Sequence, residues 1–336
     1  MNLTYLIPQF SVKRIFKVGL IVAITLLLCE STMRIWNLWH PLLRPVELMD
    51  TYGNVLFNGR WRDGTTRFYA YKPGDGLTHG HPFRVNSWGF RGGNIPKKSS
   101  IPRVVVIGDS ITSGIGIAEE DRYTDVAQKI VGPGVEIINL SVQGFDGPQM
   151  AMLLDRYGKD AQPDYVVWGF YVNDPRTDFS NYRHDLELPP TLDYLLSHSL
   201  TFRVLRPQYD HLYRWWYNLP SEEQIMKMAY DPTSTQWKVF EQSVERVRQW
   251  AVKHTGKAPS VFLVTDTQEA KNSGFYQPAR DLFEKHGYTW IEPTRDRPDE
   301  SIYHPVSRWE MHPNELTHQR LGVALAQWTT QAVIPQ

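Results

Sequence analysis

From residue 103 onward, the chain alternates between short apolar runs and longer segments whose apolar residues have helical spacing. The run 103–107 (RVVVI) is apolar and β-branched after its first residue, which is typical of a strand buried on both faces. Similar runs predict four further strands, at 135–139, 164–170, 260–264 and 288–291. Helical spacing predicts helices at 121–130, 148–157, 235–254, 278–286 and 314–332. This alternation predicts an α/β fold, a three-layer sandwich with a mainly parallel sheet of about five strands.

The N-terminus carries a strongly apolar run at residues 18–29, preceded by Lys13, Arg14 and Lys17. A basic flank before an apolar run is typical of an export signal whose basic side stays in the cytoplasm. The run is shorter than the roughly 18 residues of a full membrane span. Because no small-x-small cleavage site follows it, the pattern favours an uncleaved signal-anchor over residues 1–40. A cleaved signal peptide and a buried core helix remain alternatives, and either exported form predicts that the rest of the chain is extracytoplasmic (periplasmic).

Two segments do not follow the strand and helix pattern. Residues 41–100 are rich in Gly, Pro and aromatic residues, and we interpret them as a collar of loops and short strands. Residues 175–233 contain six prolines and several aromatic clusters, which predicts an insertion that caps the site. The remaining domain then spans residues 101–333.

Composition narrows the possible classes of function. Hydrophobic residues make up 41% of the 336-residue chain and charged residues 21%, so a large packed core is expected and global disorder is not. Lys plus Arg and Asp plus Glu both number 36, so net charge gives no reason to expect a nucleic acid partner. Cys29 is the single cysteine, which excludes an intrachain disulfide.

Candidate chemistry follows the predicted strands. Gly108, Asp109 and Ser110 come directly after the first strand, Gly144 after the second and Asn173 after the third. His312 stands just before the last helix. Because ligands bind beyond the carboxyl ends of the strands in open parallel sheets, these segments are expected to converge on one site.

The order of these segments resembles the SGNH/GDSL hydrolase superfamily. Gly108-Asp109-Ser110 matches its first block, Gly144 its second, Asn173 its third and His312 its last. The resemblance covers roughly residues 100–333 without the insertion, and it implies a flavodoxin-like SGNH fold. The collar segment 83–91 (FRVNSWGFR) is also similar to a segment of bacterial membrane-anchored members, which implies that the collar belongs to the same unit.

The chemistry of the residues agrees with serine catalysis. A serine hydroxyl needs an adjacent base, so Ser110 is the candidate nucleophile and His312 the candidate base. The amides of Ser110 and Gly144 and the side chain of Asn173 are candidates for an oxyanion hole. Many family members carry an aspartate three residues before the histidine, where this chain has Trp309. We therefore assign the orienting role to Glu310, and the chemistry requires no metal or cofactor.

Several alternatives remain open on the sequence alone. His304 and His318 are rivals of His312, and Tyr171 replaces a glycine usual in the third block, which narrows the acyl pocket. The leading hypothesis is an esterase or O-acyltransferase that acts on an acyl group, with acetyl as the leading candidate, of a small-molecule or glycan ester. A lipase or lysophospholipase at the membrane is a second hypothesis. A non-catalytic glycan-binding or assembly protein is a third, and the sequence leaves the oligomeric state open.

Overall fold

The computed structural model describes residues 12–39, 61–63, 66–68, 70–71, 73–78, 80–176, 220–265, 273–293, 303–307 and 310–334, with the single residues 199, 201, 212, 215 and 216. The chain divides into two compact units. One comprises Met1–Glu47 and Leu188–Leu219, and the other comprises Leu48–Glu187 and Pro220–Gln336. The described residues of the predicted insertion are divided between the two units: residues 199, 201, 212, 215 and 216 belong to the first, and residues 175–176 and 220–233 belong to the second.

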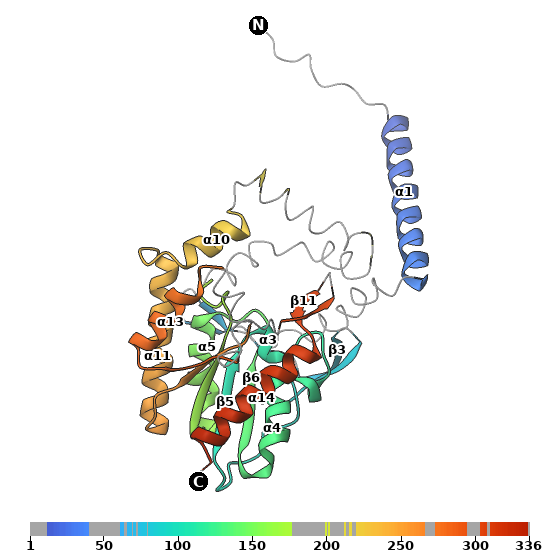
Figure 1. Cartoon of the computed structure of the whole chain (residues 1–336). Helices are drawn as coiled ribbons and strands as arrows, with labels where there is room; N and C mark the ends of the chain where they lie inside the picture. The colour runs from blue at the N-terminus through green and yellow to red at the C-terminus, as the bar shows by residue number, and fades with distance from the viewer. Residues whose placement is uncertain are drawn as a thin grey trace. The chain divides into compact units, whose positions relative to one another are not determined.

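The larger unit is built on a five-stranded sheet (Figure 1). Its strands are β5 (Arg103–Gly108), β6 (Glu136–Ser141), β7 (Tyr165–Phe170), β8 (Ser260–Leu263) and β9 (Thr289–Ile291). They pair in the order β6-β5-β7-β8-β9, and every pairing is parallel. In chain order this is 2-1-3-4-5, the flavodoxin-like order, so the predicted fold class is confirmed.

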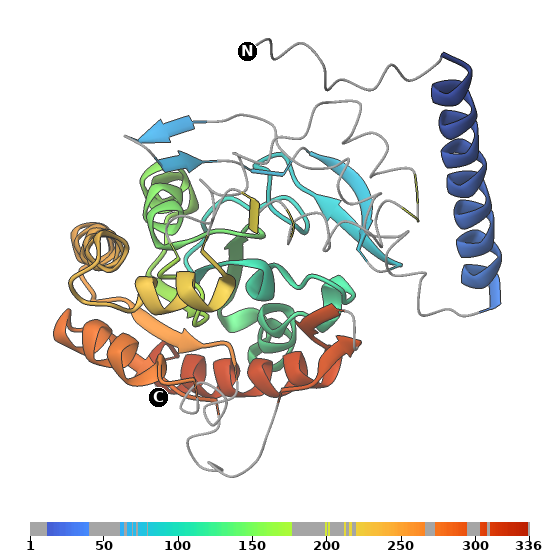
Figure 2. The ribbon, with the colours of Figure 1, turned by 90° about the horizontal axis from the view of Figure 1, so that it is seen from above.

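Burial of the strands on both faces produces the three layers. Along β5, Val105 and Ile107 belong to one buried cluster, and Val104 and Val106 belong to another. Helices α5 (Gly147–Leu153), α11 (Thr235–Thr255) and α13 (Tyr276–Lys285) supply side chains to the first cluster. Helices α4 (Tyr123–Val131) and α14 (Glu315–Ala332) supply the second, and Figure 2 shows α14 and α5 on opposite sides of the sheet.

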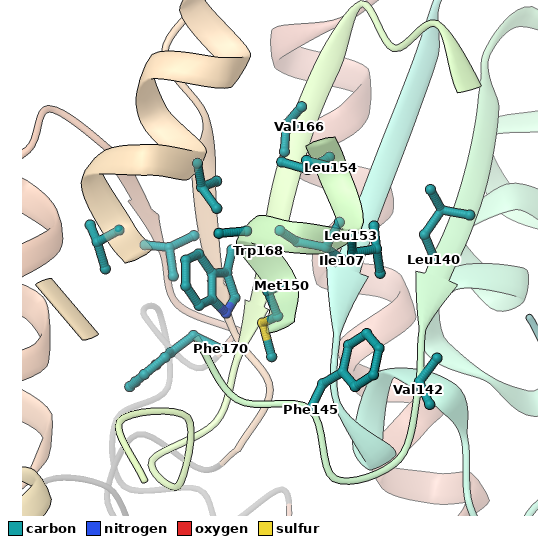
Figure 3. Close-up of a cluster of buried hydrophobic side chains, with 14 of the residues drawn as sticks. Ile107, Leu140, Val142, Phe145, Met150, Leu153, Leu154, Val166, Trp168 and Phe170 are labelled. Carbon is teal, nitrogen blue, oxygen red and sulfur yellow. The ribbon is translucent and has the colours of Figure 1, made fainter. Parts of the chain in front are cut away.

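Aromatic side chains fill much of the first cluster. Trp168 of β7 meets Phe240 and Phe283 edge to face, with ring centroids 5.9 and 5.4 Å apart. Figure 3 shows Trp168 and Phe170 on the side of the sheet where Met150 and Leu153 of α5 lie. A good part of the aromatic content of the chain is therefore core packing, which is a common use of these residues.

Helix boundaries follow capping chemistry. Ser234 caps α11 by accepting a hydrogen bond from the Trp237 amide, and Gly256 ends the helix in the left-handed conformation. The predicted helix 148–157 is shorter than expected, because α5 ends at Leu153 and continues as a π-type turn over Leu154–Gly158 and the short α6 (Lys159–Ala161). Gly158 in that turn lies against the Trp250 ring, at a distance where a Cβ atom would be 2.3 Å from Cζ2.

Short antiparallel hairpins are found outside the five-stranded sheet. In the collar, β1 (Trp61–Asp63) pairs with β2 (Thr66–Phe68), and β3 (Gly74–Thr78) pairs with β4 (His81–Val85). Near the C-terminus, β10 (Pro305–Ser307) pairs with β11 (Glu310–Pro313). The remaining described elements are α3 (Ser110–Ser113), the 3₁₀ turns η2 (Glu119–Asp121) and η3 (Gly132–Gly134), and α10 (Glu222–Ala229).

The smaller unit contains α1, which runs from Val12 to Trp39. Its stretch Phe16–Ile35 is long and apolar enough to cross a membrane, judged by length and composition. Glu30 of α1 pairs with Arg34 one turn later and accepts hydrogen bonds from the Ser199 hydroxyl (2.7 Å) and the Thr201 amide (3.0 Å). Two residues of the insertion, Ser199 and Thr201, are therefore hydrogen-bonded to the N-terminal helix.

Candidate active site

Ser110 begins the short helix α3, two residues after β5 ends. Asp109 caps this helix, because its Oδ1 accepts a hydrogen bond from the Ile111 amide at 3.0 Å. The Ser110 hydroxyl lies 3.4 Å from the other carboxylate oxygen of Asp109. Asp109 is 1% exposed and Ser110 8% exposed, so the strand-to-helix turn holds both side chains in a largely dry position.

Two glycines let α3 sit directly on the sheet. A Cβ atom on Gly108 would lie 2.1 Å from Thr112 Oγ1, and one on Gly169 would lie 2.5 Å from the same oxygen. Thr112 Oγ1 instead shares a hydrogen bond with the Tyr123 hydroxyl at 3.0 Å, and the Thr112 carbonyl accepts one from Asn139 at 2.7 Å. These contacts fix the helix that carries Ser110.

Gly144 lies in a tight turn just after β6. The Phe145 amide donates to the Val142 carbonyl (3.2 Å), and Gly144 occupies the third position of the turn with φ +76°. A side chain is disfavoured at that dihedral, so glycine is the residue that fits. The Val142 amide also donates to the Gly108 carbonyl, which ties the turn to the end of β5.

Asn173 and Asp174 lie in the turn after β7. The Asn173 side-chain oxygen is buried and has no hydrogen-bond partner in the part of the chain that the structure describes. Asp174 is fully buried and accepts from the Trp168 indole at 2.8 Å. Burial, together with the nearby charge of Asp109, raises the pKa of Asp174 well above its ordinary value. Asp174 therefore stabilises the turn that carries Asn173.

His312 lies in β11, and this strand contacts α3 with Cα atoms within 8 Å of each other. Burial raises the pKa of Asp109, and the charge of His312 opposes part of that shift. The electrostatic interaction and the contact between α3 and β11 both indicate that His312 lies at the Ser110 end of the sheet.

The two other candidate histidines, His304 and His318, make contacts that support the fold. His318 lies in the first turn of α14, is fully buried, and accepts a hydrogen bond from the Tyr123 amide through Nδ1 at 3.2 Å. Burial and the charges of Arg91 and Arg122 lower the pKa of His318 to about 3, so its imidazole stays neutral. The His304 backbone holds the hairpin, because its carbonyl accepts from the Asn314 amide at 2.7 Å.

Part of the predicted site lies outside the described residues. Glu310 belongs to the backbone of β11, but its side chain is not among those described, and Trp309 lies outside the described residues altogether. Most of the predicted cap at 175–233 also lies outside them. Among the residues that are described, no three His, Cys, Asp or Glu side chains gather as metal ligands would.

Three buried residues outside the four motifs hold the site loops, and the sequence analysis missed their roles. The Tyr71 hydroxyl contacts Ser113 and Gln143, and the Tyr230 hydroxyl donates to the Val172 carbonyl at 2.7 Å. Arg91 donates to the carbonyl of Ser113 at the end of α3 and to that of Ile117 in the loop that follows. The collar segment 83–91 gave a signal for Arg91, whereas no motif marked either tyrosine.

Comparisons with known proteins give matches among solved structures. No family model matches the chain, and no curated protein matches it. The structure titled TesA is 12% identical with a TM-score of 0.41, and the match covers 68% of this chain and 98% of that one. A carbohydrate acetylesterase family member from Sinorhizobium meliloti is 15% identical (TM-score 0.39; 69% and 98% covered). An acetyl xylan esterase is 17% identical (TM-score 0.38; 68% and 98% covered).

Other matches carry titles that name the lipolytic G-D-S-L family, among them a protein from Veillonella parvula DSM 2008 at 12% identity and a TM-score of 0.37. That match covers 68% of this chain and 98% of the other.

Proposed function

We propose that the protein is a serine ester hydrolase or O-acyltransferase in which Ser110 forms an acyl-enzyme and His312 is the base. The observation that carries this proposal is the contact between α3 and β11. Because α3 begins with Ser110 and β11 contains His312, this contact supports a shared site for a hydroxyl and an imidazole that are far apart in the sequence. The Gly144 turn is tied to the same strand end, which supports a common site for three of the four sequence blocks.

The reaction follows from these groups. His312 accepts the Ser110 proton as the hydroxyl oxygen attacks the ester carbonyl, and Glu310 orients the imidazole. The amides of Ser110 and Gly144 and the Asn173 side chain donate to the oxyanion that forms. Collapse of this intermediate expels the alcohol, which takes the proton from His312. Water or a sugar hydroxyl then attacks the acyl-enzyme by the same route, and this regenerates Ser110.

The substrate we propose is a short acyl ester, with acetyl preferred, on an extracytoplasmic glycan. Tyr171 supports the short acyl chain, because it is a large, half-buried side chain directly between β7 and the Asn173 turn. The apolar helix at Phe16–Ile35 supports an anchored protein whose catalytic part lies outside the cytoplasm.

Covalent labelling tests the nucleophile. The full-length protein in detergent is treated with a serine-directed fluorophosphonate, and the adduct is located by peptide mass spectrometry. We expect the label on Ser110 and no label in Ser110→Ala. Turnover should fall by several powers of ten in His312→Ala, because the Ser110 hydroxyl is an effective nucleophile only when His312 accepts its proton.

Ser243→Ala is the matched control, because Ser243 is a buried serine whose hydroxyl bonds the Val239 carbonyl within α11. It should label as the wild type does. A wild-type protein that labels only elsewhere, or a Ser110→Ala variant that keeps its acetyl-esterase turnover, would rule out the proposed mechanism.

The acyl acceptor is identified by product analysis. An acetyl ester is supplied with and without an oligosaccharide, and both free acetate and acetylated sugar are measured. Free acetate at a rate independent of the sugar assigns the protein as a hydrolase. Acetylated sugar formed at the expense of free acetate assigns it as a transferase.

A further inference from the structure

The collar contributes a fully buried tyrosine to the two loops that flank the proposed oxyanion hole. Tyr71 lies between β2 and β3, and its side chain has no solvent exposure. Its hydroxyl oxygen accepts a hydrogen bond from the Gln143 amide at 2.8 Å and lies 3.2 Å from Ser113 Oγ. Because the oxygen already accepts from an amide, its own hydrogen is available to donate to Ser113.

These two partners have specific places in the site. Ser113 is the last residue of α3, the helix that begins with Ser110, and Gln143 directly precedes Gly144 in the turn after β6. One hydroxyl therefore joins the helix of the proposed nucleophile to the turn of a proposed oxyanion donor. The backbone of β5 and β6 fixes the starts of these segments, and Tyr71 fixes them again beyond the strand ends.

The collar is built to hold Tyr71 in place. The Tyr71 amide donates to the Gly89 carbonyl at 3.1 Å, and a Cβ atom on Gly89 would lie 2.8 Å from the Tyr71 carbonyl oxygen. Asn86 shapes this turn, because its side-chain oxygen accepts from the amides of Trp88 and Phe90. The Phe83 ring packs edge to face against Tyr71 at 5.1 Å. Residues of the segment 83–91 thus hold Tyr71 in its position.

We propose that Tyr71 is a positioning residue, which sets the spacing between the Ser110 helix and the Gly144 turn through its hydroxyl. This inference rests on the proposed function and deepens it, since it makes the collar part of the catalytic apparatus. A positioning group affects the reacting geometry more than the affinity for substrate, because errors well below 1 Å already slow an enzymatic reaction.

The test is Tyr71→Phe, which removes one oxygen atom and keeps the ring. Turnover of p-nitrophenyl acetate and the second-order rate of fluorophosphonate labelling are measured on the full-length protein in detergent. We expect kcat and the labelling rate to fall roughly tenfold, with KM within about twofold of the wild type and the midpoint of the pH profile unchanged.

Tyr288→Phe is the matched control. Tyr288 is also buried, and its hydroxyl donates to the Val244 carbonyl at 2.8 Å, on the α11 side of the sheet. This variant should lose thermal stability by about as much as Tyr71→Phe and keep the wild-type kcat. Should Tyr71→Phe fail to fold, Ser113→Ala removes the other end of the same contact and should lower kcat with a similar KM.

The outcomes separate the two proposals. If the wild type labels at Ser110 and Tyr71→Phe or Ser113→Ala reacts at the wild-type rate, the positioning role is overturned and the enzyme stands. If both tyrosine variants lower kcat equally, the effect is one of general stability and the positioning role is again overturned. If the wild type does not label at Ser110, the proposed function fails, and the role of Tyr71 fails with it.

Discussion

Two histidines six residues apart have opposite surroundings. His312 is partly exposed on the β10–β11 hairpin, whereas His318 is enclosed between α14 and α4. The Nδ1 atom of His318 accepts from the Tyr123 amide, so the proton of the neutral ring resides on Nε2. His318 thus supports the helix pair, while the ring of His312 is partly open to solvent.

The buried state of His318 predicts an acid-sensitive fold. Its folded pKa of about 3 lies below the roughly 6.5 of an unfolded histidine, so the unfolded chain binds the extra proton first as the pH falls. The stability contribution is complete above pH 6.5 and is lost between about pH 6.5 and 3, at about 1.4 kcal/mol per pH unit.

His318→Asn should remove this dependence, because the Asn oxygen can accept from the Tyr123 amide without titrating. Urea unfolding of both proteins at pH 7 and pH 4.5 measures the difference. The wild type should lose about 2 to 3 kcal/mol more than the variant over that interval. Equal losses would show that His318 has an ordinary pKa.

At this scale, the sequence predicted candidate residues from their places after the strands. Ser110, Gly144 and Asn173 were recognisable because each follows a strand, and the ends of parallel strands share one edge of the sheet. Tyr71 was not recognisable, since its contacts with Ser113 and Gln143 join residues 42 and 72 positions apart in the chain. Periodicity reports local structure, and such a contact exists only once the collar has folded.

At the scale of elements, the predicted strands agree with the structure to within one or two residues, because wholly apolar β-branched runs have few other uses. Helix starts were less predictable. The helix expected at 121–130 begins at Tyr123, since Glu119–Asp121 form a 3₁₀ turn and Arg122 is the capping position. That turn depends on contacts with the collar, where Arg84 pairs with Glu119 at 3.2 Å.

The turn at 142–145 carries a prediction of its own. Gly144→Ala places a side chain at φ +76°, which should cost about 1 kcal/mol of stability and shift the amide proposed to bind the oxyanion. We expect kcat to fall roughly 10- to 100-fold. Unfolding and acetyl-ester turnover are the measurements.

Gly256→Ala provides the matched control for that turn. Gly256 has φ +71° at the end of α11 with no atom within 4 Å of its Cβ position, so the backbone strain is comparable and the site is untouched. Its stability should fall by a similar amount with kcat preserved. A Gly144→Ala variant as active as Gly256→Ala would exclude the Gly144 amide from the oxyanion hole.

At the scale of the whole molecule, the proposed orientation is open to a labelling test because Cys29 is the single cysteine. In a Cys29→Ala background, Ser100→Cys introduces a thiol at an exposed position of the larger unit, and Ser11→Cys introduces one before α1. An anchor with its basic end inside predicts that a membrane-impermeant maleimide labels position 100 in intact bacterial spheroplasts, and labels position 11 only after lysis. The reverse pattern would place the larger unit in the cytoplasm.

Glu30 has a practical consequence for work on this protein. Producing a water-soluble fragment by deleting the first 40 residues removes the carboxylate that the Ser199 hydroxyl and the Thr201 amide bind. Such a fragment keeps the sheet and its strand-end loops but lacks the carboxylate acceptor of Ser199 and Thr201. Measurements on it would describe a protein that lacks these contacts, so intact protein in detergent or nanodiscs is the appropriate material for substrate screening.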